Sequence, residues 1–573
     1  MDTALRSQVI EVASGREPAD LVIVNAQVVD VYNGTIVNAD VAIVGSVIAG
    51  IGSYEGKRVI DAQNRYLIPG LIDAHVHIES ALVDPASFCR LVVPHGTTTV
   101  IADPHEICNV CGLAGLDYMI EASRDLSLDI FYMLPSCVPA TEFEHAGAVL
   151  DAQALQSRIS CNEVLGLGEM MDMVRTVAGD AAILEKLEVA HRSGKLIDGH
   201  APGLSGAALN AYLAAGIQSD HECATPQELE ERIARGMYVL LREGSACKDL
   251  RNLLRGVTEK NAHRCLFCTD DRQPRSILQE GHIDNHLRIA VAEGLDPLLA
   301  IRMATVNAAT CFQLRDRGAI APGMRADLVL VDDLVDFSVH QVFTQGRPYV
   351  TEDDVESPIT ESVSGLISIG EFSEKSLRLA LASPRVRVID IQQGSVVTPA
   401  SEAIVSVDAS GYYQQDRDSD IVKIAVVERH HGTGHVGIAL IRGYGITDGA
   451  VATTIAHDSH NIIVAGDNDA DMALAVSTIR DIGGGIVLVH NQQVIDSLPL
   501  PIAGLMTNKG GRYVDDTFHT MHELAVKKLH IHEGIDPFMT LSFMALPVIP
   551  HLKVTDMGLF DVDSFSFVPI ELD

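Results

Sequence analysis

The sequence predicts an α/β protein, built on a distorted (β/α)8 TIM barrel with a small β-domain from both flanks and a separate C-terminal α+β domain. Three observations lead to this prediction. From Leu71 onward, short apolar strands alternate with helix-like stretches, which is typical of a parallel sheet. Val- and Ile-rich segments broken by turn residues stand on both sides of that region. Residues 371–573 mix strand and helix patterns of their own.

The first 70 residues form the N-terminal flank. Residues 1–15 have the pattern of a short amphipathic helix, and residues 19–66 have a β pattern. Turn residues at Asn33-Gly34 and Gly45 divide the β pattern into strands. Pro69-Gly70 ends this part, so we expect the N-terminal helix and the first part of the small β-domain in residues 1–70.

Residues 71–316 form the predicted barrel. Its polar residues gather where the apolar strands end, which is where such barrels place their active sites. Eight strands are expected, at residues 71–75, 97–102, 129–136, 164–169, 196–200, 217–221, 237–244 and 264–270.

The rest of the chain divides into three parts. Residues 317–350 return to a β pattern with turns at Gly318 and Pro322-Gly323, and we expect them to complete the small β-domain. Residues 351–370 are polar and broken, which predicts a linker. Residues 371–573 contain the strand-like segments IVKIAVVE, IIVAG and GIVLVH and the helix-like segment DADMALAVSTIRDIG, which predicts the α+β domain.

The composition excludes several classes of protein. Of 573 residues, 47% are hydrophobic and 21% are charged, which predicts sizeable cores rather than a disordered chain. The net charge of −35 argues against nucleic-acid and anionic-membrane partners. The N-terminus lacks the apolar core of a signal peptide, and no apolar run has the length of a membrane span. All ten cysteines lie at or before Cys311, which does not suit a disulfide framework, so we expect a cytoplasmic protein.

The most informative motif is Asp73-Ala74-His75-Val76-His77 at the end of the first barrel strand. Alternate residues of a strand point to the same side, so the two imidazoles are placed to bind one metal ion. Glu169, His200, His221 and Asp270 close four of the later strands. Together these residues supply four imidazoles and two carboxylates, which suits two divalent metals bridged by a carboxylate and a hydroxide.

These segments resemble the bacterial adenine deaminases of the amidohydrolase superfamily. The resemblance is carried by PGLIDAHVHIES, TTTVIADPHEICNV, GLGEM, DGHAPG, SDHE, CTDDR and RGAIAPGMRADLVLVDDL, and it extends through HDSHN and MTNKGGR to cover essentially the whole chain. It implies hydrolysis of adenine to hypoxanthine and ammonia, in purine salvage. It also implies that His75 and His77 bind a first metal with Asp270, that His200 and His221 bind a second, and that Glu169 bridges both. Many members of the superfamily carry a carbamylated lysine on the fourth strand, but that strand has no lysine here.

The chemistry of this family follows from these groups. Metal coordination lowers the pKa of a bound water to about 7, so that hydroxide is present at neutral pH to attack C6 of adenine. Asp270 is expected to take the proton of that water and to return a proton to the departing amine. His and carboxylate ligands without thiolate allow zinc, iron or manganese, and the resemblance favours manganese or ferrous iron. Related enzymes are oligomers, so we expect a dimer or a larger homo-oligomer.

The segment Asp103-Pro104-His105-Glu106, after the second strand, supplies further candidates. We assign Glu106 to protonating the purine ring or shuttling a proton, with His105 and Asp103 close by. The alternative is a structural turn, since Asp-Pro starts turns well. Arg242, Glu243 and Ser245 follow the seventh strand and are expected to orient the base, on position alone.

The sequence leaves three further questions open. The cluster His457-Asp458-Ser459-His460 is either a solvated loop or a segment that covers the barrel mouth. The substrate is either adenine or a related aminopurine such as N6-methyladenine, since the same ligands serve both. A non-catalytic assembly protein that kept the barrel is a minor alternative, but such a protein is expected to have lost ligands, and all six are present.

Overall fold

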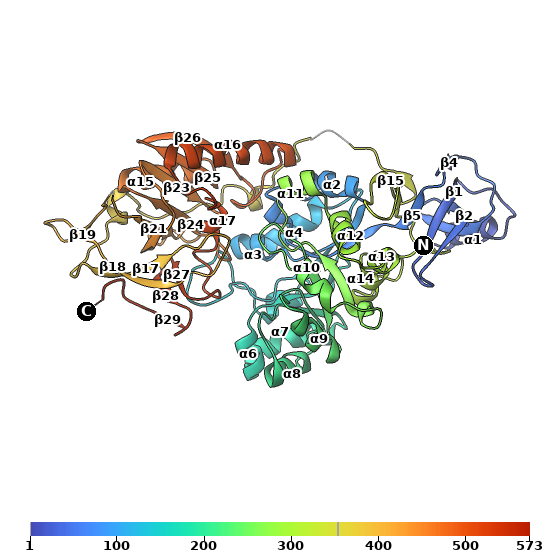
Figure 1. Cartoon of the computed structure of the whole chain (residues 1–573), viewed down its shortest axis with the longest axis horizontal. Coiled ribbons are helices and arrows are strands. Elements are labelled where there is room, and N and C mark those ends of the chain that lie inside the picture. Colours follow the sequence, from blue (N-terminus) through green and yellow to red (C-terminus); the bar gives the residue numbers. More distant parts are fainter. Residues whose placement is uncertain (1, 352–354, 417, 573) are drawn as a thin grey trace.

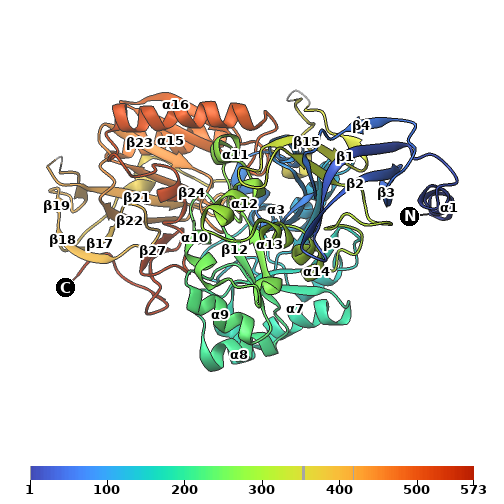
Figure 2. The same cartoon turned by 45° about the vertical axis from the view of Figure 1, so that its right-hand side comes forward.

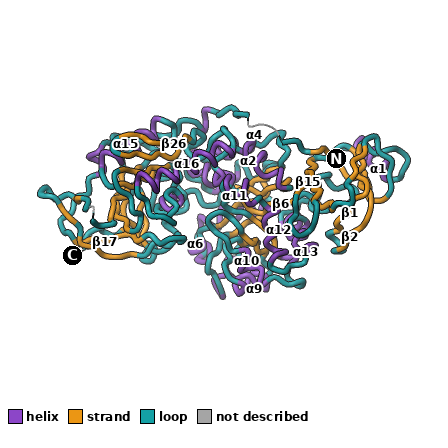
Figure 3. The backbone as a smooth tube through the Cα atoms, turned by 45° about the horizontal axis from the view of Figure 1, so that its top comes forward, coloured by secondary structure: helices purple, strands orange, loops and turns teal. Residues whose placement is uncertain are grey.

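The computed structural model describes residues 2–351, 355–416 and 418–572. A small sheet with the N-terminal helix lies at one end, the barrel lies in the middle, and a sheet-rich C-terminal part lies at the other end (Figure 1). The same order is visible after rotation (Figure 2), and strands dominate both ends when the backbone is coloured by secondary structure (Figure 3). Within the described ranges, no helix has the length and apolar character needed to cross a bilayer.

The small sheet is built from both flanks of the barrel, as the sequence predicts. Strand β5, which precedes the barrel, pairs antiparallel with β14, which follows it, in the register Pro69 to Leu328. Helix α1 (Thr3–Ala13) packs Val9 and Val12 into the adjoining core. The strands of this sheet are β1 (Leu21–Asp30), β2 (Thr35–Val44), β3 (Val47–Gly52), β4 (Val59–Asp61), β5 (Tyr66–Pro69), β14 (Leu328–Val331), β15 (Val339–Thr344) and β16 (Arg347–Pro348).

The barrel consists of eight parallel strands in two hydrogen-bonded groups, β10-β9-β8-β7-β6 and β11-β12-β13. Backbone hydrogen bonds of 2.9 Å from Asp270 N to His75 O and from His77 N to Asp270 O join the first and last strands. On the other side, Gln218 N donates to Ile197 O at 3.1 Å. The strands are β6 (Leu71–Val76), β7 (Thr97–Ala102), β8 (Asp129–Leu134), β9 (Val164–Met170), β10 (Leu196–Gly199), β11 (Ser219–Asp220), β12 (Tyr238–Arg242) and β13 (Cys265–Cys268).

Helices surround these strands and bury their apolar faces against them. They are α2 (Pro85–Val92), α3 (His105–Cys111), α4 (Leu113–Ala122), α5 (Ala152–Gln156), α6 (Met173–Ala178), α7 (Ala181–Arg192), α8 (Gly206–Ala214), α9 (Pro226–Ala234), α10 (Leu250–Leu253), α11 (Pro274–Glu280), α12 (Ile283–Ala292), α13 (Pro297–Met303) and α14 (Val306–Cys311).

Strand β11 is shorter than the expected strand at 217–221. The reason is the Asp220 carboxylate, which accepts the amide hydrogens of Ala201 at 3.0 Å and Glu222 at 3.1 Å and so turns the chain out of the ladder. Asp220 also pairs with the buried Arg232 of α9. This turn places His221 directly at the carboxyl end of the barrel.

The C-terminal part is an α+β unit, as predicted. Its sheet runs β18-β17-β22-β21-β24-β23-β25-β26, and α15 packs on one face of it. The main elements are β17 (Arg385–Asp390), β18 (Ala400–Ile404), β21 (Ile421–Val427), β22 (Val436–Arg442), β23 (Gly449–Thr453), β24 (Ile462–Gly466), α15 (Asp469–Asp481), β25 (Gly485–His490), β26 (Gln493–Pro499), α16 (Gly511–Leu529) and α17 (Met539–Ser542). Shorter strands are β19 (Ser406–Val407), β20 (Tyr413–Gln414), β27 (Leu552–Thr555), β28 (Gly558–Asp561) and β29 (Ser566–Phe567).

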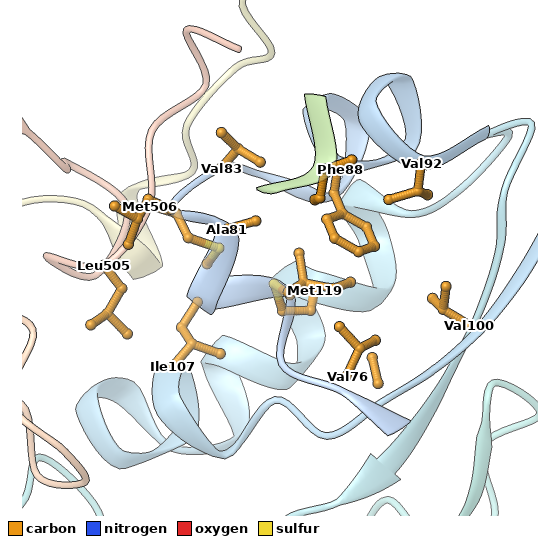
Figure 4. Packing of buried hydrophobic residues seen from close by; sticks show 14 of the residues in the cluster. Val76, Ala81, Val83, Phe88, Val92, Val100, Ile107, Met119, Leu505 and Met506 are labelled. Atoms are coloured by element: carbon orange, nitrogen blue, oxygen red, sulfur yellow. The ribbon is translucent and has the colours of Figure 1, made fainter. Parts of the chain in front are cut away.

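The C-terminal unit docks on the barrel beside its mouth. Thr507 N donates to Leu82 O at 2.9 Å, and Asp84 N donates to Thr507 O at 3.0 Å. Leu505 and Met506 pack close to Ala81, Val83 and Ile107 in one apolar cluster (Figure 4). The exact domain boundaries stay predictions, and residues 352–354 of the predicted linker lie outside the described residues.

Candidate metal centre and active site

The carboxyl ends of the barrel strands open into a cavity of about 420 Å³. This size lies within the range of roughly 300–1,000 Å³ that is usual for small-molecule sites. The cavity lies between the barrel and the C-terminal unit, which contributes an apolar wall that includes Ile455, Phe543 and Leu546. Most of the predicted site residues line it, namely His77, His105, Glu106, Glu169, His200, His221, Arg242 and Asp270.

His75 and His77 face each other at the end of β6. Their Nε2 atoms lie 3.1 Å apart, and both side chains are buried. Each ring is held from its far side, because His75 Nδ1 lies 3.0 Å from Asp198 Oδ2 and His77 Nδ1 lies 2.8 Å from the Asp103 carbonyl oxygen. Both Nδ1 atoms are thus engaged, so the Nε2 atoms are the ring nitrogens placed to bind a metal ion.

A spacing of 3.1 Å between these two Nε2 atoms suits neighbouring ligands that converge on one metal ion. The Asp270 carboxylate completes the set, since its Oδ1 lies 3.2 Å from His77 Nε2 and 3.6 Å from His75 Nε2. Histidines whose other ring nitrogen is held by a carboxylate or carbonyl are typical metal ligands. The residues therefore fit a divalent metal ion.

Glu169, at the end of β9, lies between two pairs of histidines. One carboxylate oxygen, Oε1, is 3.3 Å from His77 Nε2. The other, Oε2, is 2.8 Å from His200 Nδ1 and 3.3 Å from His221 Nε2. A single carboxylate thus presents one oxygen to each pair, which is the arrangement of a bridging ligand.

The two acidic groups remain ionised in this setting. Burial alone would raise the pKa of Glu169, but hydrogen bonds from the surrounding histidines hold that pKa well below its usual value. Burial also opposes ionisation of Asp270, whose pKa is nevertheless well below normal because of the His77 contact and the charge of Arg242. Carboxylates that stay charged while buried suit a site that holds cations.

Arg242 is buried beside Asp270 and binds it directly. Its Nη1 donates to Asp270 Oδ2 at 3.0 Å, and its Nη2 donates to Asp249 Oδ2 at 3.0 Å. It also pairs with Glu222, whose carboxylate lies 3.5 Å from His221 Nε2. Since both of its Nη groups are engaged by carboxylates, Arg242 fixes the orientation of Asp270.

His105 and Glu106 begin helix α3 at the rim of the cavity. His105 Nδ1 lies 3.2 Å from Glu169 Oε1. Burial and the neighbouring His77 lower the pKa of His105, but the contact with Glu169 and the charge of Glu106 raise it to about 10. Burial would raise the pKa of Glu106, yet the contacts with His457 and His460 hold it well below its usual value. His105 is therefore a cation between two carboxylates.

Asp103 has a different position from its neighbours in the sequence. It is buried behind Glu169, and its Oδ2 accepts the Glu169 amide hydrogen at 2.9 Å. A Cβ atom at Gly168 would lie only 2.0 Å from that oxygen, so the close approach requires glycine. Asp103 thus fixes the backbone that carries Glu169, and it does not line the cavity.

Glu243 and Ser245 also lie outside the cavity lining. The Glu243 carbonyl oxygen accepts a hydrogen bond from Arg272 Nη1 at 2.9 Å. The Ser245 hydroxyl lies 2.9 Å from Ser276 Oγ and accepts the Gln273 amide hydrogen at 2.9 Å. Arg242 therefore lies against the proposed metal ligands, whereas Glu243 and Ser245 do not line the cavity.

Several residues of the site were not predicted as such. Asp198 lies on β10 two residues before His200, and the same alternation that identified the histidines points to it. Glu222 follows His221 directly in the segment SDHE. His457, Asp458 and His460 line the cavity, as expected for a segment at the barrel mouth.

Comparison with known proteins agrees with this arrangement. Residues 66–349 match the amidohydrolase family, and residues 395–566 match the adenine deaminase C-terminal domain. Adenine deaminase 2 of Desulfotalea psychrophila is 53% identical over 580 residues, covering 100% of both chains. The adenine deaminase of Bacillus licheniformis is 43% identical over 575 residues, also covering 100% of both.

The chain belongs to the adenine deaminases of the amidohydrolase family. Solved structures with similar coordinates include an enamidase, with a TM-score of 0.45 and 19% identity over 58% of this chain and 96% of that one. A dihydropyrimidinase from Brevibacillus agri has a TM-score of 0.46 and 16% identity over 57% of this chain and 94% of that one. Membership in the family implies a divalent metal centre, and the converging ligands at the barrel mouth fit one.

Substitution of Asp198, which contacts the His75 ring, tests this metal centre. Asp198→Asn is expected to lower metal affinity by about 10–100-fold, because the His75 ring loses the carboxylate that fixes its tautomer and orientation. Metal content after dialysis against a graded chelator series measures the loss. Asp180→Asn is the matched control, because Asp180 caps α7 on the surface and asparagine caps helices equally well. Equal metal retention in Asp198→Asn and the wild type would contradict the assignment of His75.

Proposed function

We propose that this protein hydrolyses adenine to hypoxanthine and ammonia in the cavity between the barrel and the C-terminal unit. The observation that supports this most directly is the convergence of four imidazoles and two carboxylates at one wall of that cavity. Family membership supports adenine as the substrate. The complete ligand set also argues against a non-catalytic assembly protein.

Two divalent metal ions are part of the proposal. His75, His77 and Asp270 would hold the first, His200 and His221 would hold the second, and Glu169 would be shared. Manganese or ferrous iron is the proposed metal, and zinc also suits a set of nitrogen and oxygen ligands. The ions would supply the Lewis acidity that makes water nucleophilic at neutral pH.

Proton transfer is assigned to Asp270 in this proposal. Arg242 holds Asp270 Oδ2 at 3.0 Å, which leaves the carboxylate one fixed orientation at the cavity wall. A carboxylate in this place takes a proton from the attacking water and returns it to the amine as the C6–N6 bond breaks. Ammonia then leaves, and the ring keeps the oxygen as hypoxanthine.

Glu106 and His105 are assigned to the purine ring. Glu106 keeps its assignment to protonating the purine ring or shuttling a proton, and its lowered pKa favours the proton-accepting half of such a shuttle. His105 is positively charged and lies between Glu169 and Glu106, which stabilises negative charge on both sides of it. The apolar wall formed by Ile455, Phe543 and Leu546 suits the flat face of a base.

The proposal also includes a cellular location and an oligomeric state. All ten cysteines are free thiols, which supports a cytoplasmic location. A homo-oligomeric state is implied by the family resemblance, and light scattering of the purified protein measures it.

Formation of the 6-oxopurine product, hypoxanthine or inosine, from a panel of aminopurines tests the function. The protein is reconstituted with Mn²⁺, Fe²⁺ or Zn²⁺ and assayed with adenine, N6-methyladenine and adenosine. Adenine is expected to give the highest kcat/KM, with manganese or iron exceeding zinc. A preference for N6-methyladenine, which releases methylamine and hypoxanthine, would replace adenine as the substrate, and no 6-oxopurine from any pair of metal and purine would refute the proposal.

Asp270→Asn tests the assigned proton transfer. The amide oxygen still coordinates a metal and the histidines remain, so much of the metal is expected to stay. Turnover should fall by about 10²–10⁴-fold, because an amide cannot accept the proton. Asp249→Asn is the control, since Asp249 also binds Arg242, at 3.0 Å, but contacts no proposed ligand. Near wild-type turnover of Asp270→Asn at matched metal content would remove Asp270 from the mechanism.

A further inference from the structure

A loop of the C-terminal unit reaches into the active-site cavity. The loop joins β23 to β24, and its residues His457, Asp458 and His460 line the same cavity as the proposed metal ligands. Leu505 and Met506 of the same unit pack on the barrel beside Ile107 of helix α3 (Figure 4). The two histidines therefore approach α3 from the opposite domain.

Both oxygens of the Glu106 carboxylate are engaged by these histidines. His457 Nδ1 lies 2.9 Å from Glu106 Oε1, and His460 Nε2 contacts Glu106 Oε2. Glu106 is 4% exposed and His460 is fully buried, so water does not compete for these contacts. A carboxylate held at both oxygens has little freedom to rotate.

The protonation of His460 follows from its other ring nitrogen. Its Nδ1 accepts the amide hydrogen of Ala456 at 3.3 Å, so the proton of the neutral ring lies on Nε2, the atom that contacts Glu106 Oε2. His457 is fixed in a different way, since its ring stacks on Phe543 with centroids 4.9 Å apart. Each donor is thus oriented by a contact within the C-terminal unit.

We propose that His457 and His460 are positioning residues of the deaminase reaction, which hold the Glu106 carboxylate in its orientation toward the substrate. The C-terminal unit then contributes to turnover through the geometry of a barrel carboxylate. This inference rests on the proposed function, because Glu106 needs a purine to act on. A purely structural alternative is that the three residues only fasten the two domains together.

The test uses the holoenzyme at matched metal content with adenine as substrate. His457→Phe keeps a ring for stacking on Phe543 but removes the donor, and kcat/KM is expected to fall by about 10–100-fold, as for a misplaced catalytic group. His457→Asn places an amide N–H near the former Nδ1 and is expected to recover most of that loss. His460→Gln serves in the same way at the buried position, keeping a donor near the former Nε2.

A double-mutant cycle separates positioning from fastening. In a Glu106→Gln background, His457→Phe is expected to cause little further loss, because the group that it positions no longer acts. If the residues only fasten the domains, the two losses in kcat/KM multiply and the asparagine variant gives no recovery. His490→Asn is the matched control, since His490 is a half-buried histidine of the same unit that binds the Asp448 carbonyl oxygen at 2.8 Å.

The possible outcomes separate a failure of the positioning role from a failure of the proposed function. Absence of adenine turnover by the wild type with every metal refutes the proposed function. An active wild type in which His457→Phe and His460→Gln keep full turnover refutes only the positioning role, as do multiplicative losses in the cycle. A loss in His457→Phe that His457→Asn recovers and Glu106→Gln abolishes supports it.

Discussion

Two imidazole nitrogens that face each other across 3.1 Å, those of His75 and His77, set the condition on which the rest of the site depends. Each ring is held at Nδ1 by an acceptor on its far side, so the two Nε2 atoms are placed to converge on one metal ion. The buried carboxylates of Glu169 and Asp270 also favour a cation at this place. Buried carboxylates are costly without positive charge nearby, so the acidic ligands and the proposed cations stabilise one another.

This condition also explains the residues behind the ligands. Asp198 and the Asp103 backbone hold the two rings, the Asp103 side chain holds the Glu169 amide, and Arg242 holds Asp270. None of these groups needs to touch substrate to matter. The C-terminal unit also positions a group of the site, because its loop holds Glu106. Its apolar residues close the cavity. Barrel and C-terminal unit therefore line one cavity together.

The barrel strands and the proposed metal ligands could be predicted from the sequence, because the ligands lie at the ends of strands. The strands found at β6 to β13 agree with the expected ones, and period-two alternation identified His75 with His77. The direction of a side chain after a strand ends follows no period, which is why Asp103 was grouped with Glu106 although it points behind Glu169. The same limit applies to Glu243 and Ser245. The approach of His457 and His460 to α3 depends on how two domains dock, and no local pattern of residues encodes that.

Metal counting in Glu169→Gln tests the central claim most directly. The variant and the wild type are reconstituted with Mn²⁺, and the metal bound per chain is measured after removal of excess ion. The account predicts two equivalents in the wild type and reduced occupancy of both sites in the variant, because the shared carboxylate loses its charge toward each metal. Loss of a single equivalent, with the other bound as in the wild type, would contradict a bridging Glu169 and the two-metal centre built around it.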